Sequence, residues 1–129
     1  MKFELIDRVI EAEADRLVAI KAVTIAEEYL QDHFPSFPVL PGVFMLEAMV
    51  QAARAQLERS HAAGEPVVLG AVRGLKYGRF VTPGSTVRIE VERLKTEDGV
   101  AHFKGSVTLV GEEATAASGR FELRPVRIA

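Results

Sequence analysis

The sequence predicts an α+β domain in which an antiparallel β-sheet wraps around one long helix. Apolar residues recur at helical spacing from about Gly42 to Ser60. Residues 67–124 instead read as short strands, with the turn signals TEDG and GEE between the last of them. A single apolar helix beside such strands is covered only if the sheet curves around it.

The elements are expected in a fixed order of one strand, one helix and four strands. The first strand is expected over residues 16–24, where both faces are largely apolar. The apolar stripe of the helix is expected to consist of Val43, Leu46, Val50, Ala53 and Leu57. The later strands are expected over residues 67–75, 86–95, 100–110 and 114–124. In the 86–95 strand, Val87, Ile89 and Val91 alternate with charged residues, which predicts one face in water.

Composition narrows the class of protein. A chain of 129 residues with 48% hydrophobic and 26% charged residues is expected to form one domain, 1–129, with its own core. The absence of cysteine excludes disulfides and thiolate zinc sites, and it fits a reducing compartment such as the cytoplasm. No signal peptide and no membrane span are expected, and a net charge of -2 gives no reason to expect nucleic acid as a partner.

Residues 32–51, DHFPSFPVLPGVFMLEAMVQ, place a glutamate among mainly apolar side chains. Glu47 follows Val43 by one helical turn, so its carboxylate is expected to emerge near the apolar stripe. Two interpretations stay open. Glu47 is either a helix-flank residue whose head reaches water, bonded to Gln51, or a desolvated acid with the raised pKa that general acid catalysis requires.

His33 lies in a proline-stiffened segment, and such rigid loops hold catalytic side chains well. A packed or surface histidine is the alternative. His61 is explained by the helix end and His102 by a solvated strand face, and neither has a candidate partner. His33 and Glu47 without a third ligand are only a weak indication of a metal site, so no metal and no cofactor are expected.

The helix start offers a third chemical group. The backbone N–H groups of Gly42 and Val43 have no intrahelical acceptor and could polarise a carbonyl oxygen, although a plain proline-glycine turn is the alternative. Together with His33 as base and Glu47 as acid, these amides form the set needed to remove a proton α to a carbonyl and expel a β-hydroxyl.

HFPSFPVLPGVFMLEAMVQ resembles the signature of the (3R)-hydroxyacyl-[acyl-carrier-protein] dehydratases, the FabZ-type hot-dog proteins, which read HFP-x-x-P-x-x-PGV followed by E-A-x-x-Q. LIDRVIE, LKYGRFVTPGSTVRIEVERLK and FKGSVTLVGEEATAA resemble further parts of that family, so the likeness covers nearly the whole chain. The resemblance implies a hot-dog fold and a cytoplasmic lyase of fatty acid biosynthesis. Such a lyase dehydrates 3-hydroxyacyl thioesters on acyl carrier protein to trans-2-enoyl thioesters.

The resemblance also implies roles for individual residues. His33 takes the α-proton, Glu47 protonates the departing hydroxyl, and the amides of Gly42 and Val43 bind the thioester oxygen. In that family the histidine and the carboxylate of one site come from different subunits, which implies a homodimer, often assembled into a trimer of dimers. Glutamate at position 47, where the bifunctional dehydratase-isomerases carry aspartate, implies dehydration without double-bond migration. The residues expected to bind substrate are Gly42, Val43, Phe34, Phe37 and Gln51.

A basic segment predicts a partner. From Pro66 to Ile89 the chain carries no acidic residue, and Arg73, Lys76 and Arg79 are expected to dock an acidic carrier protein. Solvated cations on strands and loops are the alternative.

Two departures from the family pattern leave substrate and subfamily open. Asp32 stands where the family usually has glycine, and we expect it to point into water; Ser85 replaces a common acidic residue. The alternative functions are a hot-dog thioesterase or enoyl-coenzyme A hydratase, a non-catalytic acyl-binding homologue, and a dehydratase of a specialised pathway.

Overall fold

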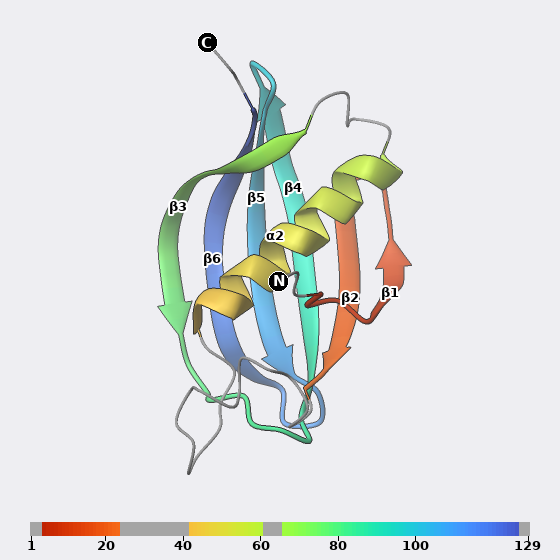
Figure 1. Cartoon of the computed structure of the whole chain (residues 1–129), viewed down its shortest axis with the longest axis vertical. Coiled ribbons are helices and arrows are strands. Elements are labelled where there is room, and N and C mark those ends of the chain that lie inside the picture. The colour runs from red at the N-terminus through yellow and green to blue at the C-terminus, as the bar shows by residue number, and fades with distance from the viewer. Residues whose placement is uncertain (1–3, 24–41, 61–65, 127–129) are drawn as a thin grey trace.

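The computed structural model describes residues 4–23, 42–60 and 66–126, which form one helix and one six-stranded sheet (Figure 1). Strands β1 (Arg8–Ala12) and β2 (Arg16–Ala22) precede helix α2 (Gly42–Arg59). Strands β3 (Val67–Tyr77), β4 (Thr86–Glu97), β5 (Val100–Leu109) and β6 (Ala114–Pro125) follow it. The order in the sheet is β1-β2-β4-β5-β6-β3, and all neighbouring strands are antiparallel.

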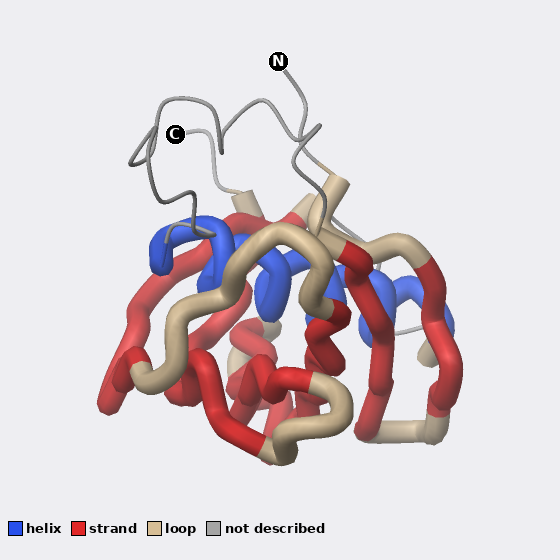
Figure 2. Tube along the Cα trace, turned by 90° about the horizontal axis from the view of Figure 1, so that it is seen from below, coloured by secondary structure: helices blue, strands red, loops and turns tan. Residues whose placement is uncertain are grey.

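The sheet curves around α2, as the sequence predicts. Figure 2 shows the strands as a wall that surrounds the helix on one side. The alternation predicted for β4 is confirmed, because Val87, Ile89 and Val91 are buried against the helix side. Their charged neighbours, Arg88, Glu90 and Glu92, lie on the other face of the sheet. We call that face, away from α2, the outer face.

The helix packs closely on β5 at a glycine. A Cβ atom at Gly105 would lie 2.8 Å from the Met49 sulfur and 3.2 Å from Cε1 of Phe121. Beside this point Phe103 and Phe121 stack with ring centroids 5.6 Å apart. Glycine is therefore required at 105 for the centre of α2 to reach the sheet.

The sheet-facing side of the helix differs in phase from the predicted stripe. Val50, Ala53 and Leu57 are buried as expected, but Val43 is 62% exposed. The residues of α2 that are buried are Met45, Ala48, Met49, Val50, Ala52, Ala53, Gln56 and Leu57. Alanines and a glutamine thus carry part of the packing, and Val43 belongs to the opposite side of the first turns.

Strand β1 is the one described element that the sequence analysis did not predict. Its residues are almost all exposed to solvent, and its pairing with β2 is irregular between Val9 and Glu11. The other strands begin where they were predicted and end within two residues of the prediction. None of the described helices has the length and apolarity that crossing a membrane requires.

Candidate active site

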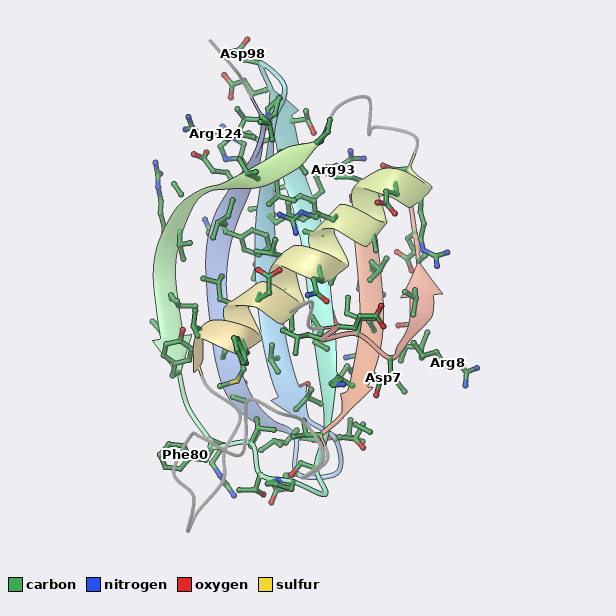
Figure 3. The ribbon with its side chains drawn as sticks, in the orientation of Figure 1. Asp7, Arg8, Phe80, Arg93, Asp98 and Arg124 are labelled. Carbon is green, nitrogen blue, oxygen red and sulfur yellow. The ribbon has the colours of Figure 1, made fainter. Side chains whose placement is uncertain are left out.

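Three of the predicted site residues, His33, Phe34 and Phe37, lie outside the described residues, as does Asp32. The described part of the candidate site is the first half of α2 and the end of β3 beside it. Figure 3 shows Phe80, in the loop after β3, at the end of the molecule where α2 begins, and Arg93 and Arg124 toward the other end.

Val43, Glu47 and Gln51 follow one another at intervals of four residues along α2. Each step advances about 6 Å along the helix axis, so the three side chains share one side of the helix. That side is open in the single chain: Val43 is 62% exposed, and the Glu47 side chain is 44% exposed. A carboxylate and an apolar side chain thus stand together, uncovered, at the helix start.

Arg54 provides the ionic contact of Glu47. Its Nη1 atom lies 3.8 Å from Oε1 of Glu47, and both side chains are more than a third exposed. The apolar surroundings that would desolvate Glu47 are therefore not supplied by the described part of this chain. Sequence reasoning missed Arg54, although its position seven residues after Glu47, two helical turns, was a usable signal.

Gln51 anchors the N-terminal segment to the helix. Its Oε1 accepts a hydrogen bond of 2.9 Å from the backbone N–H of Leu5, and Leu5 is buried. The alternative in which Glu47 is bonded to Gln51 is thus not the arrangement of the structure, where the carboxylate faces Arg54. Gln51 therefore ties the N-terminal segment to α2.

Gly42 brings the helix start against Tyr77, the last residue of β3. A Cβ atom at Gly42 would lie 2.9 Å from Cε1 and Cζ of the Tyr77 ring. Tyr77 is 52% exposed, so an aromatic ring open to solvent borders the first turn of α2. It was not predicted as a site residue, because its approach to Gly42 depends on a pairing between distant parts of the chain.

The three cations predicted to dock a carrier protein occupy two different surfaces. Arg73 and Lys76 line a hollow on the outer face. Arg79 lies in the loop after β3, with its Nη2 atom 3.5 Å from Oε1 of Glu112. Lys76 is the closer of the first two to the candidate site, because Tyr77 follows it in the chain.

His102 has a partner that the sequence analysis did not find. Its Nδ1 atom lies 3.7 Å from Oε2 of Glu122, which stands opposite it on β6. A hydrogen bond from Arg124 lowers the pKa of Glu122, so that this carboxylate is ionised at neutral pH. Among the described residues no group of three histidine, aspartate or glutamate side chains could hold a metal ion.

Comparison with known sequences identifies related proteins along nearly the whole chain. The profile of the FabA-like domain matches residues 1–118. A 3-hydroxyacyl-[acyl-carrier-protein] dehydratase FabZ from Thermus thermophilus is 41% identical over 124 residues, 95% of this chain and 87% of the relative. The FabZ of Solibacter usitatus is 40% identical over 111 residues, 84% of this chain and 68% of the relative.

Solved structures share the fold at much lower identity. The dehydratase heterocomplex ApeI:P from Xenorhabdus doucetiae matches with a TM-score of 0.72 and 21% identity, over 96% of this chain and 84% of that chain. A Streptococcus mutans protein solved with acetyl-coenzyme A matches with a TM-score of 0.75 and 14% identity, over 98% of this chain and 92% of that chain. These likenesses identify the hot-dog architecture.

Proposed function

Because the chain belongs to the FabA-like family and, within it, to the FabZ-type 3-hydroxyacyl-[acyl-carrier-protein] dehydratases, we propose how its own residues perform that reaction. The observation that carries the proposal is the open side of α2, where Glu47 stands one turn after the amides of Gly42 and Val43. A carboxyl group and unpaired N–H donors in this arrangement can act on the two ends of a 3-hydroxyacyl thioester.

The reaction breaks one C–H bond and one C–O bond. The N–H groups at the helix start donate hydrogen bonds to the thioester oxygen and stabilise the negative charge that develops there. His33 takes the α-proton, and the electron pair left behind forms the α,β double bond. The β-hydroxyl departs with a proton from Glu47, so that water and a trans-2-enoyl thioester are the products. Phe34, Phe37 and Val43 line the site of the acyl chain, and Gln51 holds the N-terminal segment at Leu5 against α2.

Two features support a homodimer with shared sites as the active unit. The open side of α2 leaves Glu47 half exposed, whereas a general acid works best away from water. Strand β3 is the last strand of the sheet, and its second edge has no partner strand in the described part of the chain. A second copy that pairs at this edge would bring its own His33 to Glu47, as a shared site requires.

The carrier protein docks, in this proposal, across the end of β3. Lys76 precedes Tyr77, whose ring lies against Gly42 at the helix start, and Arg79 follows Tyr77 by two residues in the chain. Arg73, farther along the outer face, adds to the attraction that guides an acidic partner. A cytoplasmic location follows from the acyl carrier protein as substrate.

The test identifies the products that the protein forms in each direction of the reaction. Wild-type protein is incubated with a 3-hydroxyacyl thioester and, separately, with a trans-2-enoyl thioester, each on carrier protein and on coenzyme A. Reversible interconversion without release of free thiol is expected, with preference for carrier protein. Release of free thiol would instead identify a thioesterase, preference for coenzyme A a hydratase, and binding without turnover an acyl-binding homologue.

A further inference from the structure

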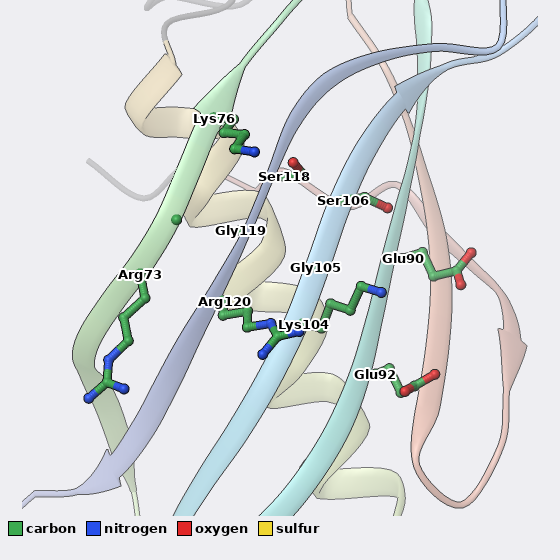
Figure 4. Close-up of a pocket in the computed structure, with 11 residues that line it drawn as sticks. Arg73, Lys76, Glu90, Glu92, Lys104, Gly105, Ser106, Ser118, Gly119 and Arg120 are labelled. Atoms are coloured by element: carbon green, nitrogen blue, oxygen red, sulfur yellow. The ribbon is translucent and has the colours of Figure 1, made fainter.

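The hollow on the outer face that Arg73 and Lys76 line lies on the opposite side of the sheet from α2. It has a volume of about 500 Å³ and lies over β3, β4, β5 and β6 (Figure 4). Gly105 and Gly119 form part of its floor, because their missing side chains would point to the helix side, toward Met49 and Leu75. The side chains around this floor are almost all charged or hydroxyl-bearing.

Three cations form one row across the sheet. Lys104 on β5 is directly opposite Arg120 on β6, and Arg120 is directly opposite Arg73 on β3. Neighbouring strands lie about 4.8 Å apart, so the three backbone positions span about 10 Å. Long lysine and arginine side chains over that distance can converge on one anion. Like charges in directly opposed positions destabilise a sheet, so this row costs stability unless something neutralises it.

A second row supplies hydroxyl groups beside the cations. Ser106 and Ser118 are directly opposite each other, two residues along from Lys104 and Arg120 on the same face. Lys76 is opposite Ser118 and extends this row onto β3. The two rows together present four cationic groups and two hydroxyls around one floor (Figure 4).

The nearby carboxylates either form ion pairs with other residues or lie on β4, at one side of the hollow. Glu122 accepts hydrogen bonds from Arg124. Glu90 pairs with Arg16 at 3.1 Å and with Arg88 at 3.2 Å. Within the part of the chain that the structure describes, no acid lies within 4.0 Å of the basic groups of Arg73, Lys76, Lys104 or Arg120. On β4, Glu92 is directly opposite Lys104 and offsets that lysine. Arg120 and Arg73 face only cations across the sheet, so the fold neutralises the row only in part.

We propose that this hollow binds a small organic phosphate, with Arg120 at the centre of the phosphate site. The arginine fork donates two parallel hydrogen bonds to a phosphate, and lysine and serine donors complete its coordination. Glu92, on β4 at the far wall, is placed to accept hydrogen bonds from hydroxyl groups on the organic part. The ligand class is thus a phosphorylated molecule with free hydroxyls, such as a nucleotide.

An acidic protein surface fits this hollow less well. A protein partner requires a contact of about 800 Å² on each side, and a broad acidic surface centred here would also meet Glu90 and Glu92. A volume of about 500 Å³ is instead within the usual range for small-molecule sites, about 300–1,000 Å³. The site is also separate from the open side of α2, because the sheet lies between them.

The test uses adenosine 3′,5′-bisphosphate as the probe, titrated by calorimetry into wild-type protein and into Arg120→Gln. Saturable binding to wild type is expected, weakened at least about tenfold in Arg120→Gln and less in Ser118→Ala. Arg59→Gln, an exposed arginine at the end of α2, is the matched control and is expected to bind as wild type does. Amide shifts in an NMR titration are expected at residues 104–106 and 118–120.

Thermal unfolding without probe gives a second readout. Arg120→Gln is expected to be at least as stable as wild type, because it relieves the opposition of like charges with Arg73 and Lys104. Equal probe affinity in wild type and Arg120→Gln, or shifts confined to another surface, would overturn the proposal. So would absence of saturable binding, a loss of stability in Arg120→Gln, or a variant that loses affinity for apo carrier protein while keeping affinity for the probe. None of these outcomes depends on dehydratase activity.

Discussion

Arg54 places its guanidinium 3.8 Å from the carboxylate of Glu47, on the open side of α2. Both side chains are more than a third exposed, and such surface pairs contribute little to stability, about 0–1 kcal/mol. The pair therefore indicates the direction of the Glu47 side chain, and it contributes little to the stability of the fold. Glu47 is aimed outward, toward the space that a partner would cover.

The Arg54→Gln variant tests that interpretation. We expect its free energy of unfolding to change by less than about 0.5 kcal/mol and its kcat for dehydration by less than about threefold, since an exposed pair is easily replaced by water. Urea denaturation and an enoyl-thioester absorbance assay measure the two quantities. A collapse of activity in Arg54→Gln would mean that Arg54 itself touches the reacting groups, contrary to this account.

Mixing of inactive variants tests the shared site. If His33 and Glu47 of one site come from different subunits, His33→Ala and Glu47→Gln are each inactive. A randomly assembled equal mixture should then recover about a quarter of wild-type activity, because half of the dimers are mixed and each has one intact site. Denaturation and joint refolding of the two variants, followed by the same assay, gives the number. Separately refolded variants are the control, and a mixture that stays inactive argues for sites within single subunits.

Gly105→Ala tests the contact that seats α2 on the sheet. The new methyl group would lie 2.8 Å from the Met49 sulfur, so we expect a loss of about 1–3 kcal/mol in unfolding free energy. Met49→Ala removes the obstacle, and the double variant should lose less than the sum of the two single variants. Urea denaturation of all four proteins measures the coupling. Strict additivity would show that the two positions do not press on each other.

The pair of Arg16 and Glu90 predicts a dependence of stability on pH. The hydrogen bond from Arg16 lowers the pKa of Glu90 below its ordinary value of 4.5. A carboxyl whose pKa is lowered by folding stabilises the native state above its unfolded pKa, and this contribution disappears as the pH falls through the native pKa. Wild type should therefore exceed Glu90→Gln in stability at pH 7, by less than about 1 kcal/mol, with the difference vanishing in acid. Urea titrations at pH 7 and near pH 3 compare the two, and a difference that grows in acid would contradict the assignment.

The helix and most strands, with their order along the chain, were predictable because their signals are local. The helix from Gly42 and the four later strands follow from periodicity and turn residues, and both are confirmed. Strand β1 was missed because its residues are nearly all exposed, so it has no buried face to generate an alternating pattern. Val43 was assigned to the wrong side of the helix because an exposed apolar residue looks, in sequence, like one that faces the core.

The geometry of the described part of the candidate site was predictable only in part. Spacing along α2 is enough to place Gly42, Val43 and Glu47 together, because a helix fixes their relation. Spacing cannot predict that Tyr77 lies against Gly42, or that Arg79 and Arg73 lie on different surfaces. Both facts depend on how β3 is placed in the sheet. The row of Lys104, Arg120 and Arg73 is likewise a product of strand register, invisible before the strands are paired.

The central claim is that Glu47 is the acid of a dehydratase, and the most direct measurement compares Glu47→Gln with Glu58→Gln. Glu58 is an exposed glutamate on the same helix, so its variant matches the change of charge and side chain. With a 3-hydroxyacyl thioester on carrier protein, we predict that Glu47→Gln loses about 10²- to 10⁴-fold in kcat while remaining folded, and that Glu58→Gln behaves as wild type. Activity of Glu47→Gln within a few-fold of wild type would contradict the account.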